Sequence, residues 1–381
     1  MQRPVHPAHH PAVIGRRGFL AGAAAMPLAA ALRSPRSGVH VAGDPRDPVF
    51  DRTDLIAGSE WWNTRPILPG HQPAYANAQA ADIRAVRFQS AVIPSTLGGR
   101  GNPALLADGI RSIQSLGAVP FVGLPPTGAH NVPGGSDPWS YAWQRWVIDR
   151  SVPLGVVLHE MGNEPNNYGR GSYGASGAAY FHDLWVNVPR LKAYARDRYG
   201  ASIYFAGPAT TRFCSRGGNL PWIQQWLGLC QQRFAATGNP DWIPDMVSVH
   251  CYGGAPATPA GSIGQAMAHL AANFDHLRGV LNAMGGPVAG ATGNVIKLVN
   301  SEYDAGIQAN IGTSWQDQGF MNDYFAAIFA MAQAASPIDG SQRVFMMNQF
   351  CTIFGGQTLA LLADDGTPQP AYHAFRSGPR P

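Results

Sequence analysis

The stretch Gly155-Val156-Val157-Leu158-His159-Glu160-Met161-Gly162-Asn163-Glu164-Pro165 contains a short apolar run followed by two glutamates and a proline. An apolar run of this length, bounded by glycine and polar residues, is typical of a buried strand, so we predict a strand over 155–158. The pattern recurs at Val295 to Val299, which precedes Ser301-Glu302-Tyr303. A buried strand that leads into a glutamate therefore occurs twice.

Six further segments of the chain resemble these two runs. The additional strands are predicted within 53–59 and at 85–88, 118–124, 203–206, 246–249 and 344–347. Helix-length segments separate them, and strands that alternate with helices predict a parallel sheet. No G-x-G-x-x-G motif follows the early strands, so a dinucleotide-binding fold lacks its signature. Eight such units predict a single (β/α)8 TIM barrel.

Three segments between the strands show clear helical periodicity. Apolar residues from Ser262 to Met284 recur four and three apart, and glycines end the pattern. The segment from Phe320 to Ala332 has a similar period, and so does Tyr180 to Tyr199, where we expect a kink at Pro189. Loops rich in Gly, Pro and aromatic residues occupy 125–139 and 166–177. Such loops after barrel strands usually build the active-site face.

The N-terminus has the composition of an export signal. Arg16-Arg17-Gly18-Phe19-Leu20 precedes a weakly hydrophobic run of small residues. We predict a twin-arginine signal over 1–32, a disordered linker over 33–47 and a catalytic barrel over 48–381. A Sec signal and a chance arginine pair are the alternatives. The run is too short to span a membrane, so we expect a periplasmic or extracellular protein with no stable membrane insertion.

Charge and cysteine content narrow the possible partners. The net charge is +4, and no run of Lys and Arg occurs, so we expect no nucleic-acid partner. None of the four cysteines forms a C-x-x-C motif, which disfavours a zinc ribbon. The pairings Cys214–Cys230 and Cys251–Cys351 are plausible in an exported protein, and four free buried thiols are equally compatible with the sequence.

Glutamate is unusually rare in this chain. The only four are Glu60, Glu160, Glu164 and Glu302; Glu160 and Glu164 follow the first of the two runs quoted above, and Glu302 follows the second. Two carboxylates directed at one bond are the equipment of a glycoside hydrolase. In an eight-stranded barrel, strands four and seven face each other across the mouth. We therefore expect the Glu164 and Glu302 carboxyl groups to lie ~5–5.5 Å apart, as in retaining enzymes.

Three further residues are candidates for supporting this pair. His250 and Tyr252 follow the sixth strand and share one face because they are two residues apart. Tyr252 could donate a hydrogen bond to Glu302, and Arg87 could pair with the same anion. The alternatives are satisfied core residues for His250 and Tyr252, and a loop salt bridge for Arg87.

Together these residues resemble those of the retaining glycoside hydrolases of clan A, and most closely family 39. The resemblance covers about Ala85 to Gly306. It is carried by Arg87, Glu160, Asn163-Glu164-Pro165-Asn166, Gly207-Pro208-Ala209, His250-x-Tyr252 and Ser301-Glu302-Tyr303. It implies that Glu164 is the acid/base, that Glu302 is the nucleophile and that Asn163 contacts the sugar. It also implies that His250, Tyr252 and Arg87 support the pair.

Aromatic side chains are candidates for stacking on sugar rings. We include Trp61, Trp62, Tyr303 and Phe350, the last near the end of strand eight, where clan members usually carry Trp. The alternative for these residues is packing under long loops. We expect no cofactor and no metal ion, since His159-Glu160 lacks a second His at zinc-binding spacing.

The resulting hypothesis is hydrolysis of a plant or bacterial-wall glycan with retention of configuration. Two other functions remain open. A transglycosylase would use the same residues in wall or capsule remodelling, and a non-catalytic barrel would only bind carbohydrate.

Overall fold

A computed structural model describes residues 55–61, 74–89, 103–124, 141–168, 176–211, 213, 220–252, 262–284, 296–304, 317–353 and 360–378. The chain divides into two units, Met1–Pro45 and Arg46–Pro381, and every described residue belongs to the second. The predicted signal (1–32), the linker (33–47) and the loop at 125–139 lie outside the described residues, as does part of the loop at 166–177.

Eight parallel strands form a closed barrel in chain order, and β8 pairs with β1. The strands are β1 (Ile56–Trp61), β2 (Ala85–Gln89), β3 (Val119–Leu124), β4 (Leu158–Met161), β5 (Tyr204–Thr210), β6 (Met246–His250), β7 (Lys297–Tyr303) and β8 (Met346–Gln349). The predicted (β/α)8 barrel is confirmed.

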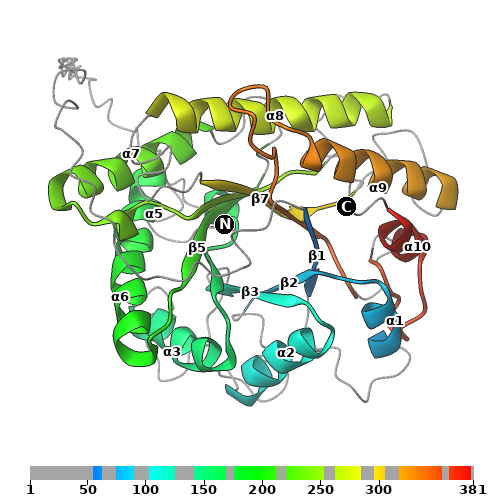
Figure 1. Ribbon diagram of the computed structural model, residues 1–381, viewed down its shortest axis with the longest axis horizontal. Coiled ribbons are helices and arrows are strands. Elements are labelled where there is room, and N and C mark those ends of the chain that lie inside the picture. The colour runs from blue at the N-terminus through cyan, green and yellow to red at the C-terminus, as the bar shows by residue number, and fades with distance from the viewer. Residues whose placement is uncertain are drawn as a thin grey trace, which may run out of the picture. The chain divides into compact units, whose positions relative to one another are not determined.

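Helices surround the strands, as Figure 1 shows. The α-helices are α1 (Ala74–Ala80), α2 (Pro103–Ser115), α3 (Tyr141–Ser151), α4 (Pro165–Tyr168), α5 (Gly177–Asp183), α6 (Val188–Tyr199), α7 (Leu220–Thr237), α8 (Ile263–Met284), α9 (Gln318–Gln333) and α10 (Pro370–Ser377). Short 3-10 helices cover Val152–Leu154, Trp185–Asn187 and Pro240–Trp242. None of the helices in the described part of the chain is long and apolar enough to cross a membrane.

The predicted position of β4 was wrong by three residues. The strand covers Leu158–Met161 rather than 155–158, because Gly155 has φ +81° and caps the preceding 3-10 helix. Glu160 therefore lies inside the strand rather than after it. The apolar run predicted at 295–299, which leads into Glu302, corresponds to β7, and this strand begins at Lys297 and ends at Tyr303.

The predicted helices at Ser262 to Met284 and Phe320 to Ala332 are confirmed as α8 and α9. The predicted helix from Tyr180 to Tyr199 is instead two helices, α5 and α6, joined by a 3-10 turn. Pro189 lies in the first turn of α6, where a residue without an N–H is tolerated. The chain therefore breaks before the proline rather than bending at it.

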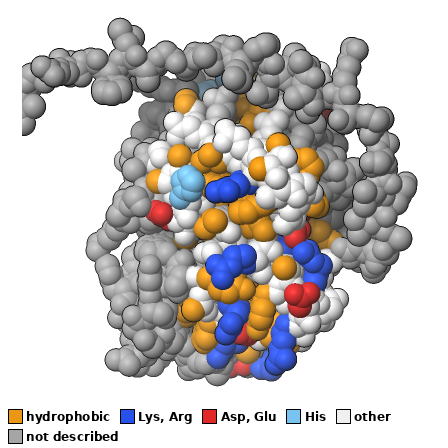
Figure 2. Space-filling view, turned by 90° about the vertical axis from the view of Figure 1, so that its left-hand side faces the viewer, with side chains coloured by type: hydrophobic (Ala, Val, Ile, Leu, Met, Phe, Trp, Pro, Cys, Tyr) orange, Lys and Arg blue, Asp and Glu red, His pale blue; other side chains and the backbone are white. Residues whose placement is uncertain are grey.

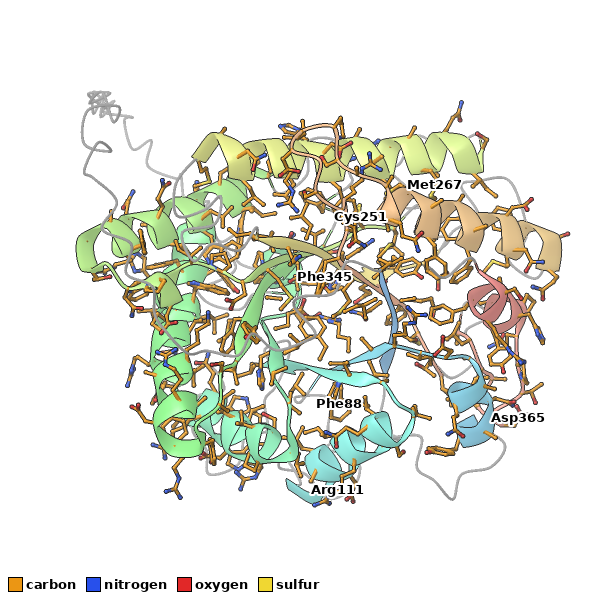
Figure 3. All side chains as sticks on the ribbon, in the orientation of Figure 1. Phe88, Arg111, Cys251, Met267, Phe345 and Asp365 are labelled. Carbon is orange, nitrogen blue, oxygen red and sulfur yellow. The ribbon has the colours of Figure 1, made fainter. Side chains whose placement is uncertain are left out.

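Alternate residues of each strand face the barrel interior and the helices, and β2 shows both faces. Arg87 points inward, whereas Phe88 points outward and packs toward Gly109 of α2 (Figure 3). The inner apolar cluster, near the N-terminal ends of the strands, consists of Ile56, Ala85, Phe121, Leu158, Ala206, Met246, Val299, Phe345 and Met346. This layer supports the polar layer that lies above it.

Figure 2 shows Lys and Arg side chains among hydrophobic and acidic ones on the face that it draws. Arg190 stacks on Tyr141, and Arg196 pairs with Asp241 at 2.6 Å. These contacts connect α6 with α3 and with the turn before β6.

Both suggested disulfide pairings were wrong. Cys230 and Cys351 are buried free thiols, whereas Cys251 is disulfide-bonded. The alternative of four free thiols is wrong for the same reason. Cys214 lies outside the described residues.

Candidate active site

A polar layer lies inside the barrel, toward the C-terminal ends of the strands. On β2, β4 and β7 its members are the inward-facing residues two positions after the apolar ones. Arg87 follows Ala85, Glu160 follows Leu158 and Ser301 follows Val299, and all three are fully buried. Charged groups at this depth need partners. Arg87 and Glu160 of this layer therefore lie beneath the side chains of the barrel mouth.

The turn after β4 directs Glu164 into the barrel mouth. Gly162 and Glu164 both have positive φ, +97° and +47°. The Gly162 N–H donates to Leu124 O on β3, and the Glu164 N–H donates to Ala209 O on β5, both at 2.9 Å. These two bonds to neighbouring strands hold a left-handed backbone that a residue other than glycine adopts rarely.

A bulge in β7 turns Glu302 inward. The register between β6 and β7 pairs Val249 with Asn300 and then His250 with Glu302, so one residue of β7 is extra. Strict alternation from Val299 would direct Glu302 outward, and a single inserted residue reverses the side on which a side chain lies. The bulge therefore brings Glu302 to the same side of the barrel as His250.

Glu164, His250 and Glu302 converge in the barrel mouth. One donor atom from each of the three lies within 4.8 Å of the other two, and all three residues are buried. His250 Nδ1 lies 3.0 Å from Glu164 Oε1 and 3.3 Å from Glu302 Oε2. The imidazole thus bridges two carboxylates on opposite strands, β4 and β7.

The charge of the pair acts on His250. Burial lowers the pKa of this imidazole, but the charge of Glu302 and the hydrogen bond with Glu164 outweigh burial. Their net effect raises the pKa of His250 above its ordinary value. The site thus favours a proton on the imidazole.

The predicted contacts of Glu302 are present. The Tyr252 hydroxyl donates to Oε1 of Glu302, and Arg87 Nη1 lies 3.5 Å from Oε2. Arg87 also donates from Nη2 to Asn163 Oδ1 at 2.6 Å. The guanidinium therefore connects the residue before Glu164 with the Glu302 carboxylate.

Glu160 was not among the predicted site residues. This residue is the nearest partner of Arg87, whose Nε donates to Glu160 Oε2 at 2.6 Å, and neither side chain is exposed. The rarity of glutamate and the spacing of four before Glu164 were the available signals. The strand was predicted to end before Glu160, which hid its inward orientation.

The aromatic predictions have mixed outcomes. The prediction for Tyr303 was wrong, because the residue is fully buried and its ring packs near Phe325 of α9. It faces the helices because its neighbour Glu302 faces inward. Phe350 is half-buried, and its N–H donates to Tyr303 O. Trp61 ends β1, but its side chain and all of Trp62 lie outside the described residues.

The three converging side chains could also be considered as metal ligands. They are the one group of His, Cys, Asp and Glu with such spacing in the described part of the chain. However, both oxygens of Glu302 already face donors, Tyr252 on one side and Arg87 with His250 on the other. A cation would have to displace these contacts beside a guanidinium, so the arrangement favours acid–base and nucleophilic chemistry.

No protein-family profile and no curated protein matches the sequence. Solved structures of low identity are similar in fold. They include a glucosidase from Croceicoccus marinus (TM-score 0.54, 14% identity, covering 85% of this chain and 67% of that one). A family 39 glycoside hydrolase from Bacteroides cellulosilyticus WH2 has a TM-score of 0.51 at 13% identity, covering 85% and 63%. The exo-beta-1,4-mannosidase Op5Man5 from Opitutaceae bacterium strain TAV5 has a TM-score of 0.53 at 13% sequence identity. This match covers 84% of this chain and 58% of that one.

These similarities concern the fold. The chain spans between 58% and 67% of the length of these three proteins. The resemblance to clan A glycoside hydrolases, including a family 39 member, is confirmed at this level. What the site does must be argued from its own geometry.

Proposed function

We propose that this protein is a retaining glycoside hydrolase, with Glu164 as acid/base and Glu302 as nucleophile. The observation that carries the proposal is the convergence of the two carboxylates, whose oxygens come within 4.8 Å of each other in the barrel mouth. Retaining enzymes hold the two groups ~5–5.5 Å apart, whereas inverting enzymes need ~6.5–9.5 Å to admit a water molecule. The short separation favours retention.

In the first step, Glu164 donates its proton to the glycosidic oxygen while Glu302 Oε attacks the anomeric carbon. The carbon–oxygen bond breaks, the leaving group departs as an alcohol and a covalent glycosyl-enzyme forms. In the second step, the Glu164 carboxylate removes a proton from water, and the water oxygen displaces Glu302. The first configuration returns because the anomeric carbon is inverted twice.

The surrounding residues fit these two steps. The Tyr252 hydroxyl donates to Glu302 and the Arg87 guanidinium lies beside it, and these two contacts orient the carboxylate for attack. The first step requires a proton on Glu164, and repulsion between two neighbouring carboxylates favours it there. Asn163 precedes Glu164 and accepts a hydrogen bond from Arg87, and we assign its amide nitrogen to a hydroxyl of the bound sugar.

The test is covalent labelling of the nucleophile. A panel of activated 2-deoxy-2-fluoro glycosides or cyclophellitol-type epoxides should label the wild-type protein on Glu302, as identified by peptide mass spectrometry. Glu302→Gln should abolish labelling, while Asp275→Asn, on α8 and paired with Arg343, should leave it intact. Labelling of a residue other than Glu302 would show the assignment to be wrong.

Labelling also separates the alternatives. A non-catalytic carbohydrate-binding barrel would give no covalent adduct with any probe. A transglycosylase would be labelled but would give longer products when an acceptor glycan is added. Product analysis with anomer-resolved NMR distinguishes these outcomes from hydrolysis with retention.

We further propose that the enzyme is exported by the twin-arginine route and acts on a plant or bacterial-wall glycan. The Arg16-Arg17 pair and the following small-residue run support export. The periplasm or the extracellular medium would then be its place of action.

A further inference from the structure

The guanidinium of Arg87 contacts three residues of the site, Glu160, Asn163 and Glu302. Arg87 Nε and Nη2 lie 2.6 Å from Glu160 Oε2, Nη2 lies 2.6 Å from Asn163 Oδ1 and Nη1 lies 3.5 Å from Glu302 Oε2. Glu160 and Arg87 are both fully buried. Their pairing is closer than the contact between Arg87 and Glu302, so Glu160 is the principal counter-ion of the guanidinium.

We propose that Glu160 is a positioning residue whose charge neutralises Arg87, so that Arg87 can orient Asn163 and Glu302 without withdrawing the catalytic proton from Glu164. This inference rests on the proposed function, because it assigns Glu160 a task in the same reaction. Glu160 does not touch the reacting atoms; it acts through Arg87.

The charge of Arg87 acts strongly on its neighbours because the guanidinium is buried. A lone guanidinium inside the barrel would favour every nearby anion, because charges interact strongly where water is excluded. It would stabilise ionised Glu302, which the reaction needs, and ionised Glu164, which the first step cannot use. The negative charge of Glu160, 2.6 Å from the guanidinium, offsets the positive charge of Arg87 for groups that lie farther away than this distance. Arg87 then acts mainly as a fixed set of hydrogen-bond donors.

The other charged and titratable groups around Arg87 come from three strands. Among the side chains that the structure describes, β4 and its following turn supply Glu160 and Glu164, β6 and its following residues supply His250 and Tyr252, and β7 supplies Glu302. The buried Asp304 after β7 is held by Gln349 Nε2 at 3.1 Å instead. Only Glu160 among these carboxylates is bound to Arg87 at 2.6 Å.

The decisive experiment compares the pH dependence of kcat/KM in Glu160→Gln and Glu160→Asp, using an aryl glycoside that the wild type hydrolyses. Glu160→Gln keeps the side-chain size but removes the charge. Both limbs of its profile should move to lower pH, by about one unit, because the Arg87 charge is no longer offset. Its kcat/KM at neutral pH should fall by up to about 10-fold, the largest change that a one-unit shift of a single limb produces. Glu160→Asp keeps the charge, so its limbs should stay in place while activity falls less.

A purely structural role for Glu160 predicts a different result. Both variants would lose activity without movement of either limb, and this outcome would overturn the proposal. If Glu160→Gln does not fold, as judged by near-UV circular dichroism, Glu160→Asn replaces it as the variant that removes the charge, with Glu160→Asp as its charged partner of equal size. Limbs that move to lower pH in Glu160→Asn but not in Glu160→Asp would support the proposal, and limbs that stay in place in both would overturn it.

A second measurement does not need turnover. The His250 imidazole can be followed by 15N-detected NMR during a pH titration, since it lies between Glu164 and Glu302. In Glu160→Gln its titration should move to lower pH, because the uncompensated cation opposes a second one; Asp275→Asn should leave it unchanged. Movement in a protein that hydrolyses no glycoside would leave the charge relation standing and reject the proposed function. An unchanged His250 titration in a Glu160→Gln variant of an active glycosidase would reject the role of Glu160 and leave the proposed function standing.

Discussion

Two tyrosines near the barrel mouth have opposite roles, although both stand beside a candidate catalytic strand end. Tyr252 donates its hydroxyl to Glu302, whereas the Tyr303 ring lies among the helices with Phe325. The difference is the side of the strand on which each residue falls. The side of the strand on which a tyrosine lies therefore decides whether it reaches the site, and closeness to Glu302 in the sequence does not.

Removing the Tyr252 hydroxyl tests its contact with the nucleophile. Tyr252→Phe should lower kcat about 10- to 100-fold with little change in KM, because a hydrogen bond to a charged group contributes ~1.5–3 kcal/mol. Tyr75→Phe is the matched control, since Tyr75 bonds to Ser115 between α1 and α2. Equal kinetics for the Tyr252 variant and the wild type would mean that this contact does not orient Glu302.

His159, next to Glu160 but on the outer face of β4, predicts acid sensitivity. Burial lowers the pKa of His159 to about 3, while its Nε2 faces Ser151 Oγ at 3.0 Å. The unfolded chain takes up a proton below about pH 6.5, and the folded protein does not until about pH 3. The stability is thus complete above pH 6.5 and is lost on acidification, by about 1.4 kcal/mol per pH unit.

The measurement is urea denaturation at pH 7 and pH 5. Between these values the wild type should lose about 2 kcal/mol through His159. His159→Gln should remove this part of the pH dependence, and His182→Gln, at an exposed position, should retain it. A pH dependence unchanged by His159→Gln would assign the acid sensitivity to other groups.

At the scale of elements, contact between α5 and α7 depends on a missing side chain. A Cβ on Gly177 would lie 1.9 Å from Trp222 O and 2.9 Å from Trp226 N. Both atoms belong to the backbone of α7, which cannot move aside as a side chain can. The first turn of α5 is thereby pressed against α7, beneath a cluster of Tyr180, Trp185 and Trp226.

Gly177→Ala should therefore lower the free energy of unfolding by ~1–3 kcal/mol, the range for overpacked sites. Gly228→Ala on α7 is the matched control, because a Cβ there meets nothing within 4 Å. That change should be neutral or stabilising by ~0.5–1 kcal/mol, since alanine favours helix. Chemical denaturation of both variants checks the pair, and equal stabilities would show that α5 shifts freely.

The order and type of elements could be predicted from sequence, and so could both catalytic candidates. Apolar runs and helical periods are local properties, which is why α8 and α9 were predicted nearly to the residue. The bulge in β7 could not be predicted, because it is a property of the pairing with β6. It decides that Glu302 faces inward and Tyr303 outward. The boundary of β4 depended likewise on the backbone of Gly155.

At the scale of the whole molecule, the proposed export route can be tested directly. Substituting Arg16→Lys together with Arg17→Lys should retain folded protein in the cytoplasm, because the twin-arginine route reads a guanidinium pair that lysine does not replace. Arg33→Lys with Arg36→Lys, in the proposed linker, is the control. Cell fractionation with immunoblotting measures both. Unchanged export of the first variant would indicate another route.

The pairing of β1 with β8 has a consequence for biosynthesis. Ser59 and Gln349, which bond to each other across this seam, are 290 positions apart. At ribosomal speeds of ~5–20 residues per second, roughly 15–60 s pass between the synthesis of one partner and the other. During that interval one edge of β1 has no strand to pair with, and it can bind chaperones or neighbouring nascent chains. The barrel, and with it the site, can close only after β8 has left the ribosome.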